Sequence, residues 1–173
     1  MEPFSFTCAC CGKEVTELPD LSFASPLAYH ELPETERAER TEINDDFCVI
    51  DGDQRFIRAV CPIPIVGSDQ IFAWGIWVSL SEENFARYAK TFDDNKQSSL
   101  GTMFGWLCNR IPAYPDTLHL QTTVDPQDDR QRPFVWINQA NNDHPLYLEQ
   151  RQGITKARLG EIYGSQVCGG EAG

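Results

Sequence analysis

Three cysteines stand within four residues near the start of the chain, in the segment 7–13 (TCACCGK). Cys8 and Cys11 have the C-x-x-C spacing at which two thiolates can bind one tetrahedral metal ion, provided that the intervening residues form a turn. Gly12 can adopt the backbone conformation that the end of such a turn requires. Backbone N–H groups in a short loop of this kind also hydrogen-bond the sulfur atoms. The spacing therefore predicts half of a four-ligand structural zinc site.

The remaining ligands of such a site must come from single residues, because the sequence contains no second C-x-x-C pair. The candidates are Cys48 and His30, with Cys61 and Cys10 as alternatives. A metal-free alternative stays open, in which the reduced thiols pack as small hydrophobic side chains. A thioredoxin-type redox pair would need a helix after the first cysteine and a strand–helix–strand frame, and the sequence has neither pattern.

The sequence contains none of the common catalytic motifs: no G-x-S-x-G, no H-E-x-x-H, no P-loop and no G-x-G-x-x-G. A catalytic pair of Cys108 with His119 or His144 has no support from their spacing. The adjacent acidic pairs at 45–46, 93–94 and 128–129 fall at expected turns, where carboxylates usually cap the backbone and face water. We therefore predict no catalytic residues.

The charge of the chain limits its partners. With 26 acidic and 14 basic residues among 173, the formal net charge is −12. Such a protein repels nucleic-acid phosphates and anionic membrane surfaces. Apolar runs stay well short of the roughly 20 residues of a membrane span, and the amino terminus lacks the pattern of a signal peptide. Seven cysteines, an odd number, argue against a disulfide framework. We expect a soluble, cytoplasmic protein.

Hydrophobic patterning predicts five strands, over residues 47–50, 55–60, 71–80, 117–124 and 134–137. The first two strands flank a D-G-D turn and form a hairpin, and the last two form a second hairpin. Pro62 and Pro64 are expected to end the strand at 55–60 or confine it to an edge. The run at 71–80 carries Trp74 and Trp77, which predicts a central strand covered on both faces.

Helices are predicted over 32–40, 82–92 and 144–163, the last interrupted near Gly153. Ser81 is a typical N-cap for the second of these helices. Its apolar positions follow the helical spacing i, i+3, i+4, i+7, and they are Phe85, Tyr88, Ala89 and Phe92.

Hairpins outnumber strand–helix–strand units in this pattern, which predicts an α+β fold: an antiparallel sheet with packed helices and an N-terminal zinc-knuckle-like C-x-x-C. The length suits one domain, 1–173. In that domain the acidic, cysteine-containing segment 1–46 packs on the remainder, and residues 165–173 form a loose tail.

The sequence resembles a bacterial family of unknown function, DUF2199, over about residues 4–163. The segments that carry the resemblance are 6–12 (FTCACCG), 48–51 (CVID), 56–58 (FIR), 62–65 (PIPI), 74–80 (WGIWVSL), 84–85 (NF), 104–107 (FGWL), 114–118 (YPDTL) and 143–146 (DHPL). The run at 74–80 is the most specific of them.

What the resemblance implies is a function by binding. Proteins that look like this one stand in some bacterial loci beside secreted polymorphic toxins, in the position of the immunity protein. The resemblance thus implies a non-enzymatic inhibitor that occludes the active site of a cognate toxin, such as an ADP-ribosyltransferase or another toxin that blocks translation. An acidic inhibitor associates quickly with a basic cleft, and residues 14–53, which hold much of the acid, are expected to contribute to docking. The alternative is a zinc- or thiol-dependent enzyme of unknown substrate.

Overall fold

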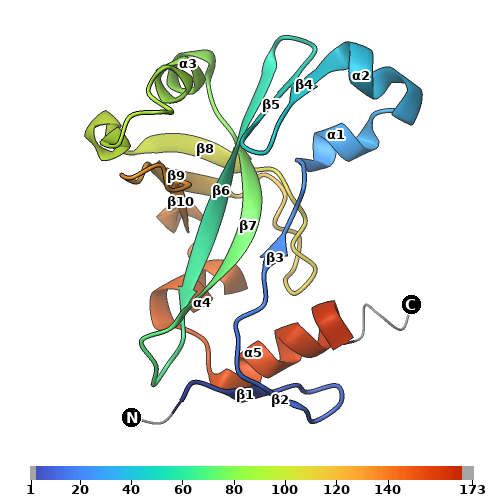
Figure 1. Cartoon of the computed structure of the whole chain (residues 1–173), viewed down its shortest axis with the longest axis vertical. Coiled ribbons are helices and arrows are strands. Elements are labelled where there is room, and N and C mark those ends of the chain that lie inside the picture. The colour runs from blue at the N-terminus through green and yellow to red at the C-terminus, as the bar shows by residue number, and fades with distance from the viewer. Residues whose placement is uncertain (1–2, 169–173) are drawn as a thin grey trace.

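The computed structural model describes residues 3–168, and a closed ring of strands organises them (Figure 1). The members of the ring are β6 (Gln54–Pro64), β7 (Ile71–Ser79), β8 (Met103–Leu107), β9 (Gln121–Asp125) and β10 (Phe134–Ile137). They pair in the order β7-β8-β9-β10-β6, and β6 also pairs with β7, which closes the ring. All of these pairs are antiparallel except β10–β6, which is parallel. The α+β fold class is confirmed, but the prediction of a purely antiparallel sheet is wrong.

The chain before β6 adds strands to the outside of this ring. β3 (Leu21–Ser22) pairs with β7 in parallel, while β5 (Phe47–Ile50) and β4 (Thr41–Ile43) continue the sheet beyond β6. β1 (Phe6–Thr7) and β2 (Glu14–Val15) form a separate two-stranded hairpin. Figure 1 shows this hairpin at one end of the ring, with β4 and β5 at the other end.

The core lies on both sides of β7. Inside the ring, apolar side chains from every ring strand are buried together, among them Ile57, Ile63, Phe72, Trp74, Ile76, Leu107, Val124 and Val135. On the other side of the strand, Trp77 packs with Cys48, Ile50, Phe56 and Cys108. Trp74 and Trp77 are 2% and 0% exposed. The predicted central strand, covered on both faces, is confirmed.

The helices lie around this sheet (Figure 1). They are α1 (Leu27–Glu31), η1 (Glu34–Glu36), α2 (Arg37–Arg40), α3 (Glu82–Lys90), η2 (Gln97–Leu100), η3 (Gln139–Asn141), α4 (Pro145–Gln152), α5 (Lys156–Tyr163) and the π-helical turn η4 (Gly164–Cys168). None of the helices in residues 3–168 is long and apolar enough to cross a membrane.

Local signals placed the helix ends well. The Ser81 side chain accepts a hydrogen bond from the Asn84 N–H and begins α3, and the His144 ring accepts one from the Leu146 N–H and begins α4. Gly153, with φ of 82°, separates α4 from α5 as predicted. The apolar face of α3 packs its aromatic rings around Phe47, but Ala89 is exposed, so that face is narrower than predicted.

The prediction that Pro62 and Pro64 end the strand is wrong, because β6 continues through both of them. Even-numbered residues here direct their backbone polar groups away from β7, as the Val60 N–H shows by donating to the Pro133 carbonyl. A proline at such a position removes no hydrogen bond from the β6–β7 ladder. The amide of Gln150 on α4 donates to the carbonyls of Pro62 and Val135, and so bridges β6 and β10.

Two further predictions fail at chain turns. The strand expected over 117–124 begins only at Gln121, because the Thr117 hydroxyl bonds the backbone of Asn109 and Ile111 and His119 takes a φ of 66°. Residues 165–168 of the expected loose tail form the π-helical turn η4 instead, while residues 169–173 lie outside the described part of the chain.

Candidate metal centre

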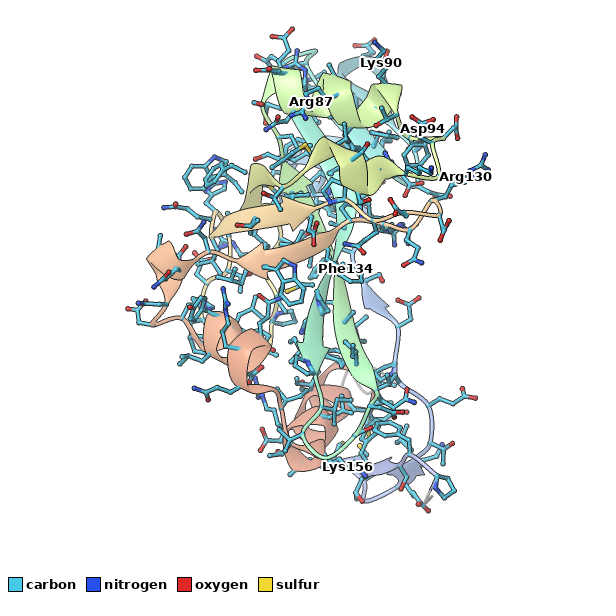
Figure 2. The ribbon with its side chains drawn as sticks, turned by 90° about the vertical axis from the view of Figure 1, so that its left-hand side faces the viewer. Arg87, Lys90, Asp94, Arg130, Phe134 and Lys156 are labelled. Atoms are coloured by element: carbon cyan, nitrogen blue, oxygen red, sulfur yellow. The ribbon has the colours of Figure 1, made fainter. Side chains whose placement is uncertain are left out.

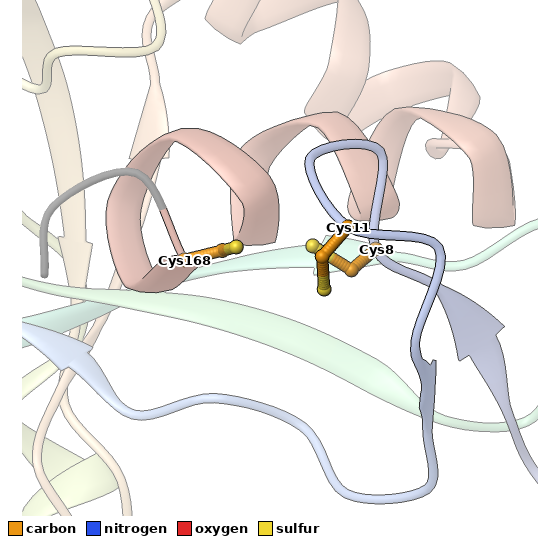
Figure 3. A group of neighbouring side chains, drawn as sticks. All are labelled: Cys8, Cys11 and Cys168. Carbon is orange, nitrogen blue, oxygen red and sulfur yellow. The ribbon is translucent and has the colours of Figure 1, made fainter. Parts of the chain in front are cut away.

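Three cysteines from the two ends of the chain come together at the β1–β2 hairpin. The sulfur atoms of Cys8, Cys11 and Cys168 all lie within 4.8 Å of one another (Figure 3). Zinc–sulfur bonds of about 2.3 Å place two sulfurs of a tetrahedral site about 3.8 Å apart. The group therefore needs only small side-chain movements to hold one metal ion.

The C-x-x-C segment forms the turn of its hairpin, as its spacing predicted. Phe6 pairs with Val15 and Thr7 with Glu14, so the two strands present the turn between them. Inside the turn, the Cys8 N–H donates to the Lys13 carbonyl and the Gly12 N–H donates to the Cys8 carbonyl, both at 2.9 Å. Gly12 has a φ of 75°, a conformation that residues with a Cβ rarely adopt.

Helix α5 brings Cys168 to this turn. The Ala9 N–H donates to the Gly160 carbonyl at 3.1 Å, and a Cβ at Gly160 would overlap the Thr7 carbonyl oxygen. A Cβ at Gly164 would lie 3.0 Å from the Cys10 nitrogen. The two glycines thus let the helix backbone touch the hairpin backbone. Cys168 follows Gly164 by four residues, and its sulfur reaches the same place.

Two connections fix the direction of α5. The Ile154 N–H donates to the Pro64 carbonyl and the Val66 N–H donates to the Ile154 carbonyl, both at 2.8 Å, so the link between α4 and α5 is paired to the end of β6. On the helix itself, the Arg158 guanidinium bonds the Glu149 carboxylate at 2.8 Å and the Ala113 carbonyl at 3.1 Å. These connections hold the N-terminal end of α5, while the backbone contacts of Gly160 and Gly164 hold its other end against the hairpin, so Cys168 is carried by a fixed element.

Two of the three thiols, Cys8 and Cys168, differ in how readily they ionise. Burial opposes ionisation of Cys8, but hydrogen bonds from the backbone of Cys11 and Cys10 and from neighbouring thiols lower its pKa below the ordinary value. The pKa of Cys168 is raised to about 12, first by a hydrogen bond with the Cys10 thiol and then by burial. Cys8 is therefore easier to ionise than Cys168, and its neighbours act as donors to it. A bound cation would replace those donated protons.

The other ligands predicted from the sequence lie elsewhere. Cys48 is on β5 in the second apolar cluster, where burial raises its pKa to about 11, and His30 is exposed on α1. Figure 1 shows both elements at the end of the ring opposite β1 and β2. The structure therefore does not bring Cys48 and His30 to the site as predicted. Their elements, β5 and α1, lie at one end of the sheet, and the C-x-x-C turn lies at the other.

Among the alternatives, Cys61 is buried within the ring and Cys10 lies in the turn itself. The Cys61 sulfur accepts a hydrogen bond from the Gln150 amide at 3.3 Å, and burial raises its pKa to about 12. Sequence reasoning missed Cys168, which it assigned to the tail. The signal that could have found it is the spacing of Gly160, Gly164 and Cys168, which marks one closely approached face of a helix.

A second place with chemically capable residues is a cavity of about 320 Å³ beside β7, lined in part by Cys108, His119, Arg55 and Glu31. The Cys108 thiol donates to the Trp106 carbonyl at 3.3 Å, and burial raises its pKa to about 11. His144, the other suggested partner, caps α4. A nucleophilic cysteine needs a lowered pKa, so this cavity lacks an activated thiolate.

The architecture defines a class: a small α+β protein with a closed mixed sheet and a three-cysteine group that could hold a metal ion. The chain belongs to DUF2199, a family of uncharacterised proteins conserved in bacteria, whose model matches residues 7–154. The family resemblance inferred from the sequence is thus confirmed. The matched range includes Cys8 and Cys11 and ends before Cys168. Searches of curated proteins and of solved structures found no match to the chain.

Proposed function

We propose that the protein works by binding another protein: it is a cytoplasmic immunity protein that occludes the active site of a toxin made by the same bacterium. The observation that carries this proposal is the outer face of β8, β9 and β10. We call it the aromatic face, and its residues are Phe104, Trp106, Gln121, Thr123, Asp125, Phe134 and Trp136.

Strand pairing makes this face continuous. Thr123 of β9 pairs with Phe104 on one side and with Trp136 on the other, so the three side chains form one row. Trp106 pairs with Gln121, and Phe134 pairs with Asp125. Figure 2 shows these strands on the side of the molecule that faces the viewer, with Phe134 below the helix that carries Arg87 and Lys90.

The aromatic residues of β8 are not needed to fill the core. Met103, Gly105 and Leu107 point into the ring, so Phe104 and Trp106 must point out. They remain 44% and 42% exposed, and their rings meet edge to face at 5.0 Å. On β10 the rings of Phe134 and Trp136 are half-buried and lie 6.3 Å apart. Accessible aromatic side chains such as these supply the large contact areas that dominate protein–protein binding energy.

The charge of the protein indicates the partner. At a net charge of −12, long-range attraction favours a partner with a basic surface and raises its association rate. Catalytic clefts that bind nucleotides or other phosphorylated molecules are basic for the same electrostatic reason. The acidic segment 14–53 lies mainly on the other side of the ring from β8, β9 and β10 (Figure 1), so it is not part of this docking face. In this proposal the net charge of the whole protein attracts the partner, while the aromatic face forms the central contact.

We expect association with the toxin encoded beside the gene to slow steeply between low and high salt, because exposed charges are screened beyond about 8 Å at physiological ionic strength. Dissociation should change little with salt. Trp106→Ala should raise the dissociation rate about thirtyfold or more, which corresponds to a hot-spot loss of about 2 kcal/mol. Surface plasmon resonance with growth rescue measures these effects.

Ile71→Ala is the matched control, because Ile71 is an apolar side chain even more exposed than Trp106 and lies next to the β6–β7 turn, outside the aromatic face. It should leave both rates unchanged. Failure of the wild-type protein to bind the toxin or to rescue growth contradicts the proposed function, whereas equal effects of the two variants contradict only the assigned surface.

We further propose that the metal held by Cys8, Cys11 and Cys168 is zinc with a structural role. Thiolates at tetrahedral spacing favour zinc, and such sites contribute directly to folding free energy. The hairpin carries little core of its own, because β1 and β2 have two residues each. A metal ion bound by both the hairpin and η4 would tie it to α5.

The purified protein should carry close to one zinc ion per chain, measured by elemental analysis after purification without chelators. Cys8→Ser should lower this content well below one, because it removes one of the three thiols of the group. Cys108→Ser, a change at a cysteine outside the group, should leave the zinc content unchanged. A wild-type protein without metal would contradict the zinc proposal and leave the binding function standing.

A further inference from the structure

Three thiolates leave one position of a tetrahedral zinc ion open, and the nature of the fourth ligand decides what the centre can do. A closed site with four protein ligands stabilises the fold, whereas a site with three and a water molecule can activate that water for hydrolysis. Within residues 3–168, no histidine or carboxylate groups with Cys8, Cys11 and Cys168. The fourth ligand must therefore be water or a residue just outside this group.

Cys10 lies beside the group on the side that faces Cys168. A Cβ at Gly164, four residues before Cys168, would be 3.2 Å from the Cys10 Cβ, so Cys10 borders the helix face that carries Cys168. This contact places Cys10 next to the three-cysteine group, on the helix face that also carries Cys168.

The Cys10 side chain is exposed, so no packing holds it in one rotamer. A single change of χ1 moves its sulfur by about 3 Å. Cα atoms of consecutive residues are only 3.8 Å apart, so side-chain rotation can bring the Cys10 and Cys11 sulfurs to the separation of about 3.8 Å that two sulfurs on one zinc ion have. Cys10 and Cys11 can therefore bind the same ion.

We propose that Cys10 is the fourth ligand, and that the centre is a closed four-cysteine site formed by the hairpin turn and η4. This inference rests on the proposed zinc binding. Four thiolates around one divalent ion leave a local charge of −2 and no position for water or substrate. The centre then serves only to hold the hairpin against α5, which excludes it as the catalytic metal of the alternative zinc enzyme.

Cobalt substitution tests the proposal, because each thiolate bound to cobalt contributes to a ligand-to-metal charge-transfer band. Cys10→Ser should lose about a quarter of that band's intensity per bound cobalt, as expected for three thiolates in place of four. Its visible d–d bands should weaken and move to higher energy. Cys108→Ser, in the second apolar cluster, is the matched control and should keep the wild-type spectrum.

X-ray absorption on the zinc-loaded wild-type protein supplies a measurement that depends on no variant: the expected first shell is four sulfur atoms. A shell of three sulfurs and one oxygen or nitrogen, or a Cys10→Ser spectrum equal to that of the wild type, overturns the assignment of Cys10 while zinc binding stands. Failure of the wild-type protein to bind either cobalt or zinc overturns the proposed metal site itself, and with it this inference.

Discussion

Replacing Trp77 by alanine is expected to destabilise the protein by about 3–5 kcal/mol, enough to unfold most of it. Trp77 is fully buried, and its indole N–H donates to the Phe23 carbonyl at 2.9 Å. Its ring fills the second apolar cluster, between β7 and the strands β5 and β6. Alanine would leave a cavity there and an unpaired carbonyl, and the segment that carries Phe23 would be attached to the ring by its backbone pairing with β7 alone.

Chemical denaturation followed by circular dichroism measures this effect. Trp106→Ala removes the same side chain from an exposed position on β8, so its unfolding midpoint should stay close to that of the wild type. A cooperative Trp77→Ala transition at the wild-type denaturant concentration would show that the second cluster does not hold the fold together.

Gly160→Ala should detach the β1–β2 hairpin from α5. The added Cβ would overlap the Thr7 carbonyl oxygen, and the groups in contact are backbone on both sides, so no flexible side chain can make room. The hairpin must then move away, which breaks the hydrogen bond from the Ala9 N–H to the Gly160 carbonyl. Overpacking of this kind costs about 1–3 kcal/mol. Cys8 and Cys11 would also be separated from Cys168, so tight metal binding should be lost.

Competition with a chelator of known zinc affinity measures the second part of this effect, and thermal unfolding measures the first. Ala157→Ser is the control, since Ala157 is exposed on the same helix and should tolerate the change in both assays. If Gly160→Ala binds zinc as tightly as the wild type, the close contact of helix and hairpin is not what assembles the centre.

Local sequence determined the elements that depend on neighbouring residues. The turn at Asp51 and Gly52 has positive φ at both residues and joins β5 to β6, as its composition predicted. Ser81 and His144 cap their helices through hydrogen bonds within three residues. The C-x-x-C turn is of the same kind, because its hydrogen bonds join residues 8, 12 and 13. Signals that act over a few residues can be recognised without knowing the rest of the chain.

The closure of the sheet could not be recognised in this way. Only one residue pair, Phe134 with Val60, joins β10 to β6 in parallel, and the Gln150 amide extends that contact from a helix. Nothing in the sequences of β6, β10 and α4 indicates that these three segments meet. Pro62 and Pro64 predicted the end of a strand, and that prediction is wrong. Whether a proline removes a hydrogen bond from a sheet depends on which neighbouring strand its nitrogen faces, and the local sequence does not show this.

The family and the fold class, then, were determined by the sequence itself, as was one half of the candidate metal site: Cys8 and Cys11 stand three residues apart and any compact turn brings them together. Only the tertiary structure decided the other half. In the structure Cys48 and His30 lie at the far end of the ring, and the third cysteine of the group is Cys168, more than 150 residues away along the chain. The physical reason is that backbone contact between α5 and the hairpin requires glycine at two positions, and that requirement exists only once the two segments are packed together.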